Sequence, residues 1–383
     1  MADVEFALAE KVNRAPADEP EDRVEEAIPE AAVQDEWLVG FSSKSELLLL
    51  AELAARYGGR LIGVNEALGM ARFQFDSAAG NRAFRLSTAE GRETGANFLV
   101  KAPDRPEVSD PNPEEEPETL IAFGRSALPW LGLEDDHIEW GRGTKVAVLD
   151  TGISPHRVFD EMEVLQMDLI DLEAGGFDYD GHGTAVASIV AQVSPSAEIL
   201  SVRVLDSEGI GNSFTVAEGI VAAADYGARV INLSMGTYTD SLVLSQAVSY
   251  ALDRGVTVIA AAGNDGSGAP SYPAAYEGVI GVSAIDADGR VASFSNHGSS
   301  VDMAAPGVGV LAAAGETSAV LMSGTSAAAP FVAGTVAALY SEGLASTPRQ
   351  IWQQLEAHAV DVGEVGVDPA SGTGALQLGA LVN

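Results

Sequence analysis

The stretch KVAVLDTGI, residues 145–153, decides the fold of this chain. Between Lys145 and Asp150 every residue is apolar, which is typical of a strand buried on both faces of a parallel sheet. An aspartate ends the strand, and a Thr-Gly turn follows. In open α/β sheets, functional residues lie beyond the carboxyl ends of the strands. Asp150 is therefore either a functional residue or an ordinary turn aspartate.

Strand-like and helix-like segments alternate from this stretch to the C-terminus. The other apolar segments are EILSVRVLD (198–206), ARVINLSMG (228–236), GVTVIAAAGN (255–264) and GVIGVSAID (278–286). Helical patterns lie between them at 183–193, 214–227 and 241–255. The alternation predicts an α/β fold with a doubly wound, mostly parallel sheet over residues 119–383.

Three further regions precede this domain. Residues 1–35 are rich in Glu, Asp, Ala and Pro, and we expect them to be disordered. Residues 36–103 follow the order β-α-β-β-α-β, which predicts a small ferredoxin-like α+β domain with ANFLVKA (96–102) as its last strand. Residues 104–118 contain four prolines and seven acids, and they predict an extended linker open to proteolysis.

Composition excludes several classes of function. The 383-residue chain has a formal net charge of −35, which disfavours binding to nucleic acid or to an anionic membrane. It has no cysteine, so disulfides, thiolate catalysis and cysteine-bound zinc are excluded. No segment approaches the ~20 apolar residues of a membrane span. The start MADVEFALAE is acidic and is no signal peptide, so either the protein is intracellular or a signal was trimmed.

Four polar residues stand at expected strand ends or helix starts. Besides Asp150, they are His182 in GHGT, Asn264 after VIAAAG, and Ser326 in SGTSAAAP. Each alone has an ordinary explanation: a turn aspartate, a structural histidine, a turn asparagine and a helix-capping serine. We expect Ser326 to open a helix with Pro330 in about its first turn, where a missing N–H costs little. Together, the order Asp, His, Asn, Ser predicts a nucleophile with a base, an orienting acid and an oxyanion donor.

The joint pattern VAVLDTGI, GHGT, SMG, AAAGN and SGTSAAAP resembles the subtilisin-like serine proteases. The resemblance covers about residues 119–383, including DMAAPG and the closing GTGALQLGALV. It implies that Ser326 is the nucleophile of a serine endopeptidase and His182 its base. Asp150 would orient the imidazole, and the Asn264 side chain and the Ser326 N–H would form the oxyanion hole.

The resemblance also implies where substrate binds. The strand edge for extended substrate would be Ser234, Met235 and Gly236, its opposite wall Gly209, Ile210 and Gly211, and the loop flanking the primary specificity pocket Ala261, Ala262 and Gly263. The peptide bond between Tyr272 and Pro273 should be cis. The chain departs from the family at Ala185, Ala327 and Phe331, which stand where histidine, methionine and histidine are usual.

The same resemblance carries expectations about cofactors and partners. No cofactor is needed for the chemistry, and the short stretch AQVSPSAEILSV lacks the long calcium-binding loop of many relatives. Asp302 matches a position that helps hold a weaker, structural calcium or other cation in some of them. Residues 36–103 are similar to the propeptides that help these proteases fold and then inhibit them, with ANFLVKAP leading into the cleft. We expect a monomeric zymogen that acts on polypeptides, is secreted, and clips itself between about 100 and 120; a cytoplasmic location is the alternative.

Two other functions stay open at this point. Serine-carboxyl (sedolisin-like) peptidases share the sheet and the serine loop, but they use a glutamate base and an aspartate at the oxyanion site. His182 and Asn264 argue against them. The non-enzyme alternative is a catalytically silent subtilase-fold binding module whose N-terminal domain never leaves.

Overall fold

A seven-stranded parallel sheet forms the centre of the computed structural model, which describes residues 31–89, 91–102, 120–133, 137–170, 178, 181–269, 271–298 and 300–379. The strand order is β13-β12-β11-β10-β6-β8-β7, and all neighbouring pairs run parallel. The strands are β6 (Lys145–Asp150), β7 (Val164–Asp168), β8 (Glu198–Arg203), β10 (Val230–Leu233), β11 (Thr257–Ala261), β12 (Ile280–Ile285) and β13 (Met303–Pro306). This architecture confirms the predicted fold class.

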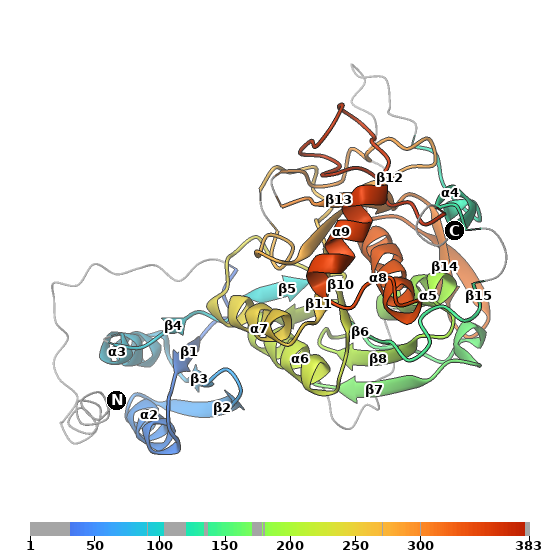
Figure 1. The fold of residues 1–383 in the computed structure, drawn as a ribbon. Helices are drawn as coiled ribbons and strands as arrows, with labels where there is room; N and C mark the ends of the chain where they lie inside the picture. Colours follow the sequence, from blue (N-terminus) through green and yellow to red (C-terminus); the bar gives the residue numbers. More distant parts are fainter. Residues whose placement is uncertain are drawn as a thin grey trace.

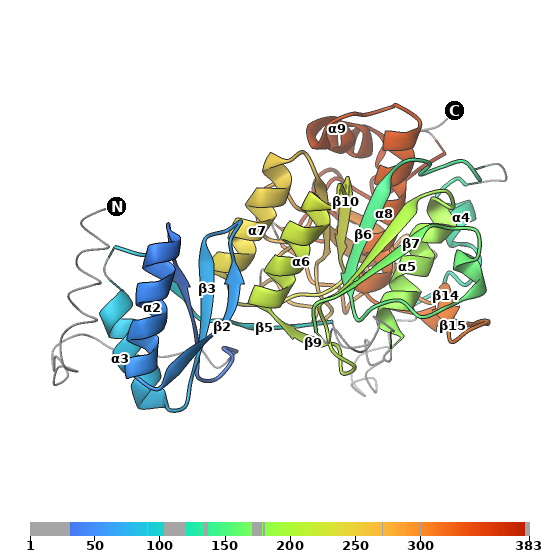
Figure 2. The same cartoon turned by 90° about the horizontal axis from the view of Figure 1, so that it is seen from below.

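Helices cover both faces of the sheet (Figures 1 and 2). One face packs against α5 (His182–Val193) and α8 (Thr325–Ser341), and the other against α6 (Ser213–Asp225) and α7 (Leu242–Asp253). In β6, Val146 and Val148 belong to the first core, whereas Ala147 and Leu149 belong to the second. Successive side chains of a strand point to opposite faces, so a strand between two helical layers is apolar at every position.

The chain changes direction along the sheet at β6. Strands β7 and β8 lie on one side of β6, and β10 to β13 lie on the other. Ligands of open α/β sheets bind at such a switch point, outside the carboxyl ends of the strands. Asp150 ends β6 and Ser234 follows β10, so both lie at this crevice.

Smaller elements complete this unit. They are α4 (Ala127–Trp130), the 3-10 helix η1 (Arg157–Phe159), β9 (Ile210–Asn212), the hairpin β14 (Val310–Ala314) and β15 (Ser318–Met322), and α9 (Pro348–His358). Among the described residues, no helix has the length and apolar character needed to cross a membrane.

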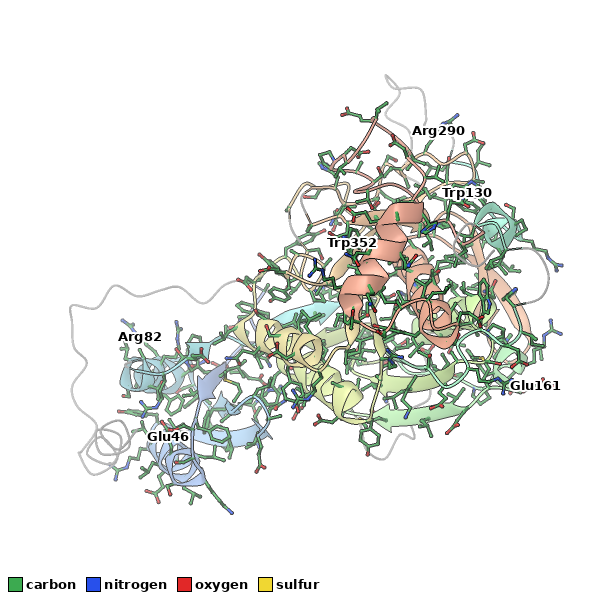
Figure 3. The ribbon with its side chains drawn as sticks, in the orientation of Figure 1. Glu46, Arg82, Trp130, Glu161, Arg290 and Trp352 are labelled. Atoms are coloured by element: carbon green, nitrogen blue, oxygen red, sulfur yellow. The ribbon has the colours of Figure 1, made fainter. Side chains whose placement is uncertain are left out.

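The N-terminal unit has its own four-stranded sheet in the order β2-β3-β1-β4. Its elements are β1 (Glu36–Gly40), α2 (Lys44–Arg56), β2 (Gly59–Asn65), β3 (Met70–Phe75), α3 (Ala78–Thr88) and β4 (Thr94–Gly95). Glu46 on α2 and Arg82 on α3 lie at the opposite end of the molecule from Trp130 on α4 (Figure 3). Most of the predicted 1–35 segment, as far as residue 30, lies outside the described residues, and so does the predicted linker 104–118.

The last predicted strand of this unit differs from the prediction. Only Thr94 and Gly95 pair with β1, whereas β5 (Leu99–Lys101) leaves the small sheet and pairs with β9 in the larger unit (Figure 2). The cause is Phe98, which lies between β4 and β5 and holds the chain against the start of α6. Its N–H donates to the Ser213 hydroxyl, and its carbonyl accepts from the Ser213 N–H. The small unit packs against α6 and α7 (Figures 1 and 2).

Candidate active site

The structure brings Asp150 and His182 together at the crevice. Asp150 ends β6 and His182 begins α5, and Nδ1 of the histidine lies 2.7 Å from Oδ1 of the aspartate. The aspartate is buried, with a side chain only 1% exposed, and the histidine side chain is 11% exposed. The backbone N–H of Thr151 also donates to Asp150 Oδ1, at 2.8 Å. A neutral imidazole that donates from Nδ1 keeps a lone pair on Nε2, which is the form that a general base needs.

Asp178, which the sequence reading missed, supports the start of α5. Its Oδ1 accepts from the Gly181 N–H at 2.7 Å and from the Thr151 hydroxyl at 2.8 Å. Its Oδ2 accepts from the N–H and the hydroxyl of Thr184, at 2.7 and 2.6 Å. The N-cap residue Gly181 has no side chain, so Asp178 supplies the acceptor for the first turn. An acidic residue four positions before a histidine carries no signal that would have found it.

Ser326 is the second residue of α8 and does not cap the helix. The N-cap is Gly324, and Ser326 is 2% exposed with its Oγ donating to the Ser234 carbonyl at 3.4 Å. The prediction that Pro330 lies in the first turn is wrong, because it is the sixth residue of the helix. Proline has no N–H for the carbonyl four residues back, which is that of Ser326. The Ser234 hydroxyl donates to this carbonyl instead, at 3.2 Å.

Asn264 lies in the loop after β11 and contacts the start of α8. Its Oδ1 accepts from the N–H and the hydroxyl of Thr325, both at 2.9 Å. The Gly263 N–H donates to the same hydroxyl at 3.0 Å. Gly324 has φ +136°, which favours glycine, and a Cβ there would lie 2.9 Å from Asn264 Nδ2. The Thr325 side chain, another residue missed by the sequence reading, thus orients the amide beside the N-terminus of α8.

The two expected substrate edges lie on either side of the chain's own strand β5. On one side, the Lys101 N–H donates to the Gly236 carbonyl at 3.0 Å, and the Gly236 N–H donates back at 2.8 Å. On the other side, β5 pairs antiparallel with β9, where Lys101 faces Ile210 and Val100 faces Gly211. The Ala102 N–H extends this contact to the Gly209 carbonyl at 2.9 Å. Of the remaining edge residues, Ser234 adjoins Ser326, and Met235 has its side chain in the core.

The third predicted wall follows β11. Ala261 ends the strand, Ala262 donates to the Val282 carbonyl at 3.0 Å, and Gly263 has φ +106°. The Tyr272–Pro273 peptide bond is cis, as predicted.

Asp302 lies away from these residues. Its Oδ2 accepts from the Gly281 N–H at 2.8 Å, and burial raises the pKa of its carboxyl to about 6. The described parts of the chain contain no group of three or more His, Asp or Glu side chains that could hold a metal ion. Calcium takes six to eight oxygen ligands, so this single carboxylate does not by itself make a calcium site.

Asp302→Asn should raise stability at neutral pH. A carboxyl with a raised pKa stabilises the folded state below the unfolded pKa, and this contribution is lost as the pH rises through about 6. Asparagine keeps an acceptor for Gly281 without the charge. The midpoint of thermal unfolding of the variant should therefore exceed that of wild type by more at pH 7.5 than at pH 4. The exposed Asp160→Asn is the control, and a gain that is larger at pH 4 would contradict the prediction.

Comparison with known proteins gives the family. Residues 141–374 match the model described as Subtilase family, and this range contains Asp150, His182, Asn264 and Ser326. A thermophilic serine proteinase from Bacillus sp. (strain AK1) is 42% identical over 212 residues, which are 52% of this chain and 53% of that protein. Thermitase from Thermoactinomyces vulgaris is 42% identical over 214 residues, or 53% of this chain and 77% of thermitase. The match thus spans about half the length of the first of these relatives.

A solved structure extends the likeness to the N-terminal unit. The crystal structure of fervidolysin from Fervidobacterium pennivorans, a keratinolytic enzyme related to subtilisin, is similar with a TM-score of 0.79 and 26% identity. The similarity covers 93% of this chain and 62% of that one. A coverage of 93% can be reached only if the N-terminal unit is included. The subtilisin-like fold and the match over most of the larger unit identify the chain as a member of the subtilase family.

Proposed function

We propose that the protein is a serine endopeptidase that cleaves peptide bonds through Ser326, His182 and Asp150. The observation that carries the proposal is the 2.7 Å contact between the buried Asp150 carboxylate and the His182 imidazole. It supports the proposal because a buried carboxylate on Nδ1 fixes the tautomer and stabilises the charged imidazolium. Membership of the subtilase family supports it independently.

In this reaction the Ser326 hydroxyl oxygen attacks the carbonyl carbon of the substrate, and its proton passes to His182 Nε2. The imidazolium then protonates the departing amine, which leaves an acyl ester on Ser326. Water attacks this ester with His182 again as the base, the imidazolium returns the proton to Ser326 Oγ as the ester bond breaks, and the acid product is released. The oxyanion that forms in both steps would accept from the Asn264 amide and the Ser326 N–H, beside the positive end of α8. Side chains and water suffice for this chemistry, so it requires no cofactor.

We further propose that the N-terminal unit is an inhibitory propeptide. Support comes from β5, which lies between β9 and Gly236 with antiparallel main-chain bonds on both sides, as an extended peptide substrate would. Asn97 supports the attachment, because its buried side chain joins the two units. Its Nδ2 donates to Glu36 Oε2 at 2.8 Å and to Asn212 Oδ1 at 3.1 Å, and its Oδ1 accepts from the Ser213 hydroxyl and the Phe214 N–H, both at 3.0 Å.

Asn97→Ala should weaken inhibition by the N-terminal unit. The substitution leaves buried donors and acceptors at the start of α6 unsatisfied, which costs about 1–3 kcal/mol. Full-length variant chain should therefore hydrolyse a peptide substrate with a shorter lag than wild type. Glu93→Ala is the matched control, since Glu93 contacts Gln246 on α7 through an exposed hydrogen bond of 2.6 Å. Equal lags for Asn97→Ala and wild type would contradict this attachment.

Labelling with a fluorophosphonate tests the proposed function directly. After mild trypsin nicking of the full chain, the reagent should modify Ser326 in wild type and fail to modify His182→Ala, because only an activated serine reacts. A folded, nicked wild type that takes up no label would favour the binding module. Hydrolysis with an optimum near pH 4 would favour the serine-carboxyl alternative. Secretion and the monomeric state stay predictions.

A further inference from the structure

We infer that Asn296 is a positioning residue for the oxyanion site, an inference that rests on the proposed function. Asn296 lies between β12 and β13 in sequence, and it is 2% exposed. No motif in the sequence singles it out. The residues that it contacts nevertheless lie both before and after Asn264 in the sequence.

The Asn296 amide uses every hydrogen-bonding position that it has. Its Oδ1 accepts from the N–H groups of Asp265 and Ser267, at 3.1 and 3.0 Å. Its Nδ2 donates to the Ala262 carbonyl and to the Tyr238 hydroxyl, both at 2.9 Å. An amide offers two acceptor lone pairs and two hydrogens, so no capacity is left.

The backbone of the loop is built closely around this amide. The Asn296 N–H donates to the Gly263 carbonyl at 2.9 Å, which is the fourth hydrogen bond between Asn296 and this loop. A Cβ at position 263 would lie 2.3 Å from Asn296 Nδ2, and Gly263 has φ +106°. Only glycine therefore allows the loop to approach so closely. Residues 262, 263, 265 and 267 are all held by one side chain and its backbone, and Asn264 lies among them.

Tyr238 extends the link to the substrate-binding edge. This tyrosine follows Ser234–Gly236 by two residues, and its hydroxyl accepts from Asn296 and donates to the Asp265 carboxylate. Tyr238 is 49% exposed, whereas Asn296 is buried. The same amide thus joins the loop that carries Asn264 to Tyr238, which follows the strand edge expected to pair with extended peptide.

These contacts show that two different residues position the side chain and the backbone of Asn264. Thr325 on α8 orients the Asn264 side chain, and Asn296 holds the backbone that carries it. An oxyanion donor has to lie about 2.7–3.1 Å from the oxygen that becomes negative, so a small displacement of the loop weakens the hydrogen bond from Asn264 to that oxygen. This interaction is strongest in the transition state, and its loss lowers kcat more than it raises KM.

A double-mutant cycle tests the role, on enzyme that the full chain has produced by processing itself. Active-site titration first gives the concentration of active enzyme, and kcat and KM are then measured for wild type, Asn264→Ala, Asn296→Ala and the double variant. Asn296→Ala should lower kcat about tenfold or more and change KM by less than about threefold. In the Asn264→Ala background the same substitution should change kcat by less than about threefold, because the group that it positions is gone.

Asp286→Ala is the matched control. Asp286 is another buried side chain that holds a loop, accepting from the N–H groups of Asp288, Arg290 and Ile121 at 3.0, 3.0 and 3.2 Å. It should lower the midpoint of thermal unfolding and leave kcat within about twofold of wild type. If Asn296→Ala does not fold, Tyr238→Phe replaces it in the cycle, with a kcat loss of about two- to fivefold that disappears in the Asn264→Ala background.

The outcomes separate this inference from the proposed function. A wild-type chain that neither hydrolyses peptide nor reacts with a fluorophosphonate would overturn the proposed function and the role of Asn296 with it. An active wild type in which Asn296→Ala causes the same fold-loss in both backgrounds would overturn only the positioning role. An unchanged kcat in Asn296→Ala would do the same.

Discussion

Ser326→Ala is expected to lower kcat for peptide hydrolysis by about a millionfold. The magnitude is the one known for loss of the nucleophile in subtilisin, a member of the same family, and it sets the scale expected for this chain. The physical reason is that alanine has no oxygen to attack the carbonyl carbon, so only binding and the oxyanion donors remain to assist water. Initial rates on a peptide substrate at neutral to alkaline pH give the measurement.

The same variant tests self-processing. Wild-type chain should clip itself between about 100 and 120, and Ser326→Ala should stay full length on a denaturing gel. Ser341→Ala, at the other end of α8, is the matched control and should clip as wild type does. Clipping by purified Ser326→Ala would contradict self-processing through this serine.

Asp150→Asn is expected to lower kcat by about ten-thousandfold. Asparagine fills the same space, but it carries no charge to stabilise the imidazolium, and its amide can hold the imidazole in the wrong tautomer. The magnitude is the one known for the same substitution in another Ser-His-Asp protease. The effect should be large here because Asp150 is 1% exposed, so solvent does not screen its charge.

Steady-state kinetics and fluorophosphonate labelling should both register this loss, while KM stays near the wild-type value. Asp160→Asn serves as the control, because Asp160 is an exposed carboxylate at the end of η1, between β6 and β7. A loss of less than tenfold in Asp150→Asn would show that His182 does not depend on this carboxylate.

The amino-acid pattern alone was enough to predict the larger fold. In β6, Val146 and Val148 pack toward one helical layer and Ala147 and Leu149 toward the other. A strand buried on both faces can therefore be recognised from a run of consecutive apolar residues. That signal is local, and it needs no knowledge of distant parts of the chain. It also places Asp150 at a strand end, where an open sheet binds its ligands.

The tertiary structure decided the contacts that join distant segments. Phe98 bonds Ser213, so β5 leaves the small sheet, although its sequence is typical of that sheet's last strand. Pro330 lies deeper in α8 than predicted, where the Ser234 hydroxyl satisfies the Ser326 carbonyl that the proline cannot reach.

The residues that support the site were likewise invisible in the sequence. Asp178, Asn296 and Asn97 belong to no periodic pattern, and each matters through hydrogen bonds to loops or helix ends that the fold brings near. Hydrophobic periodicity reports which side of a strand or helix is buried, so the sequence by itself determined the sheet and its helical layers. The sequence also placed the four polar residues at strand ends and helix starts. The bonds of a buried polar side chain depend on which backbone groups lie within about 3 Å of it, and only the packed chain sets that distance.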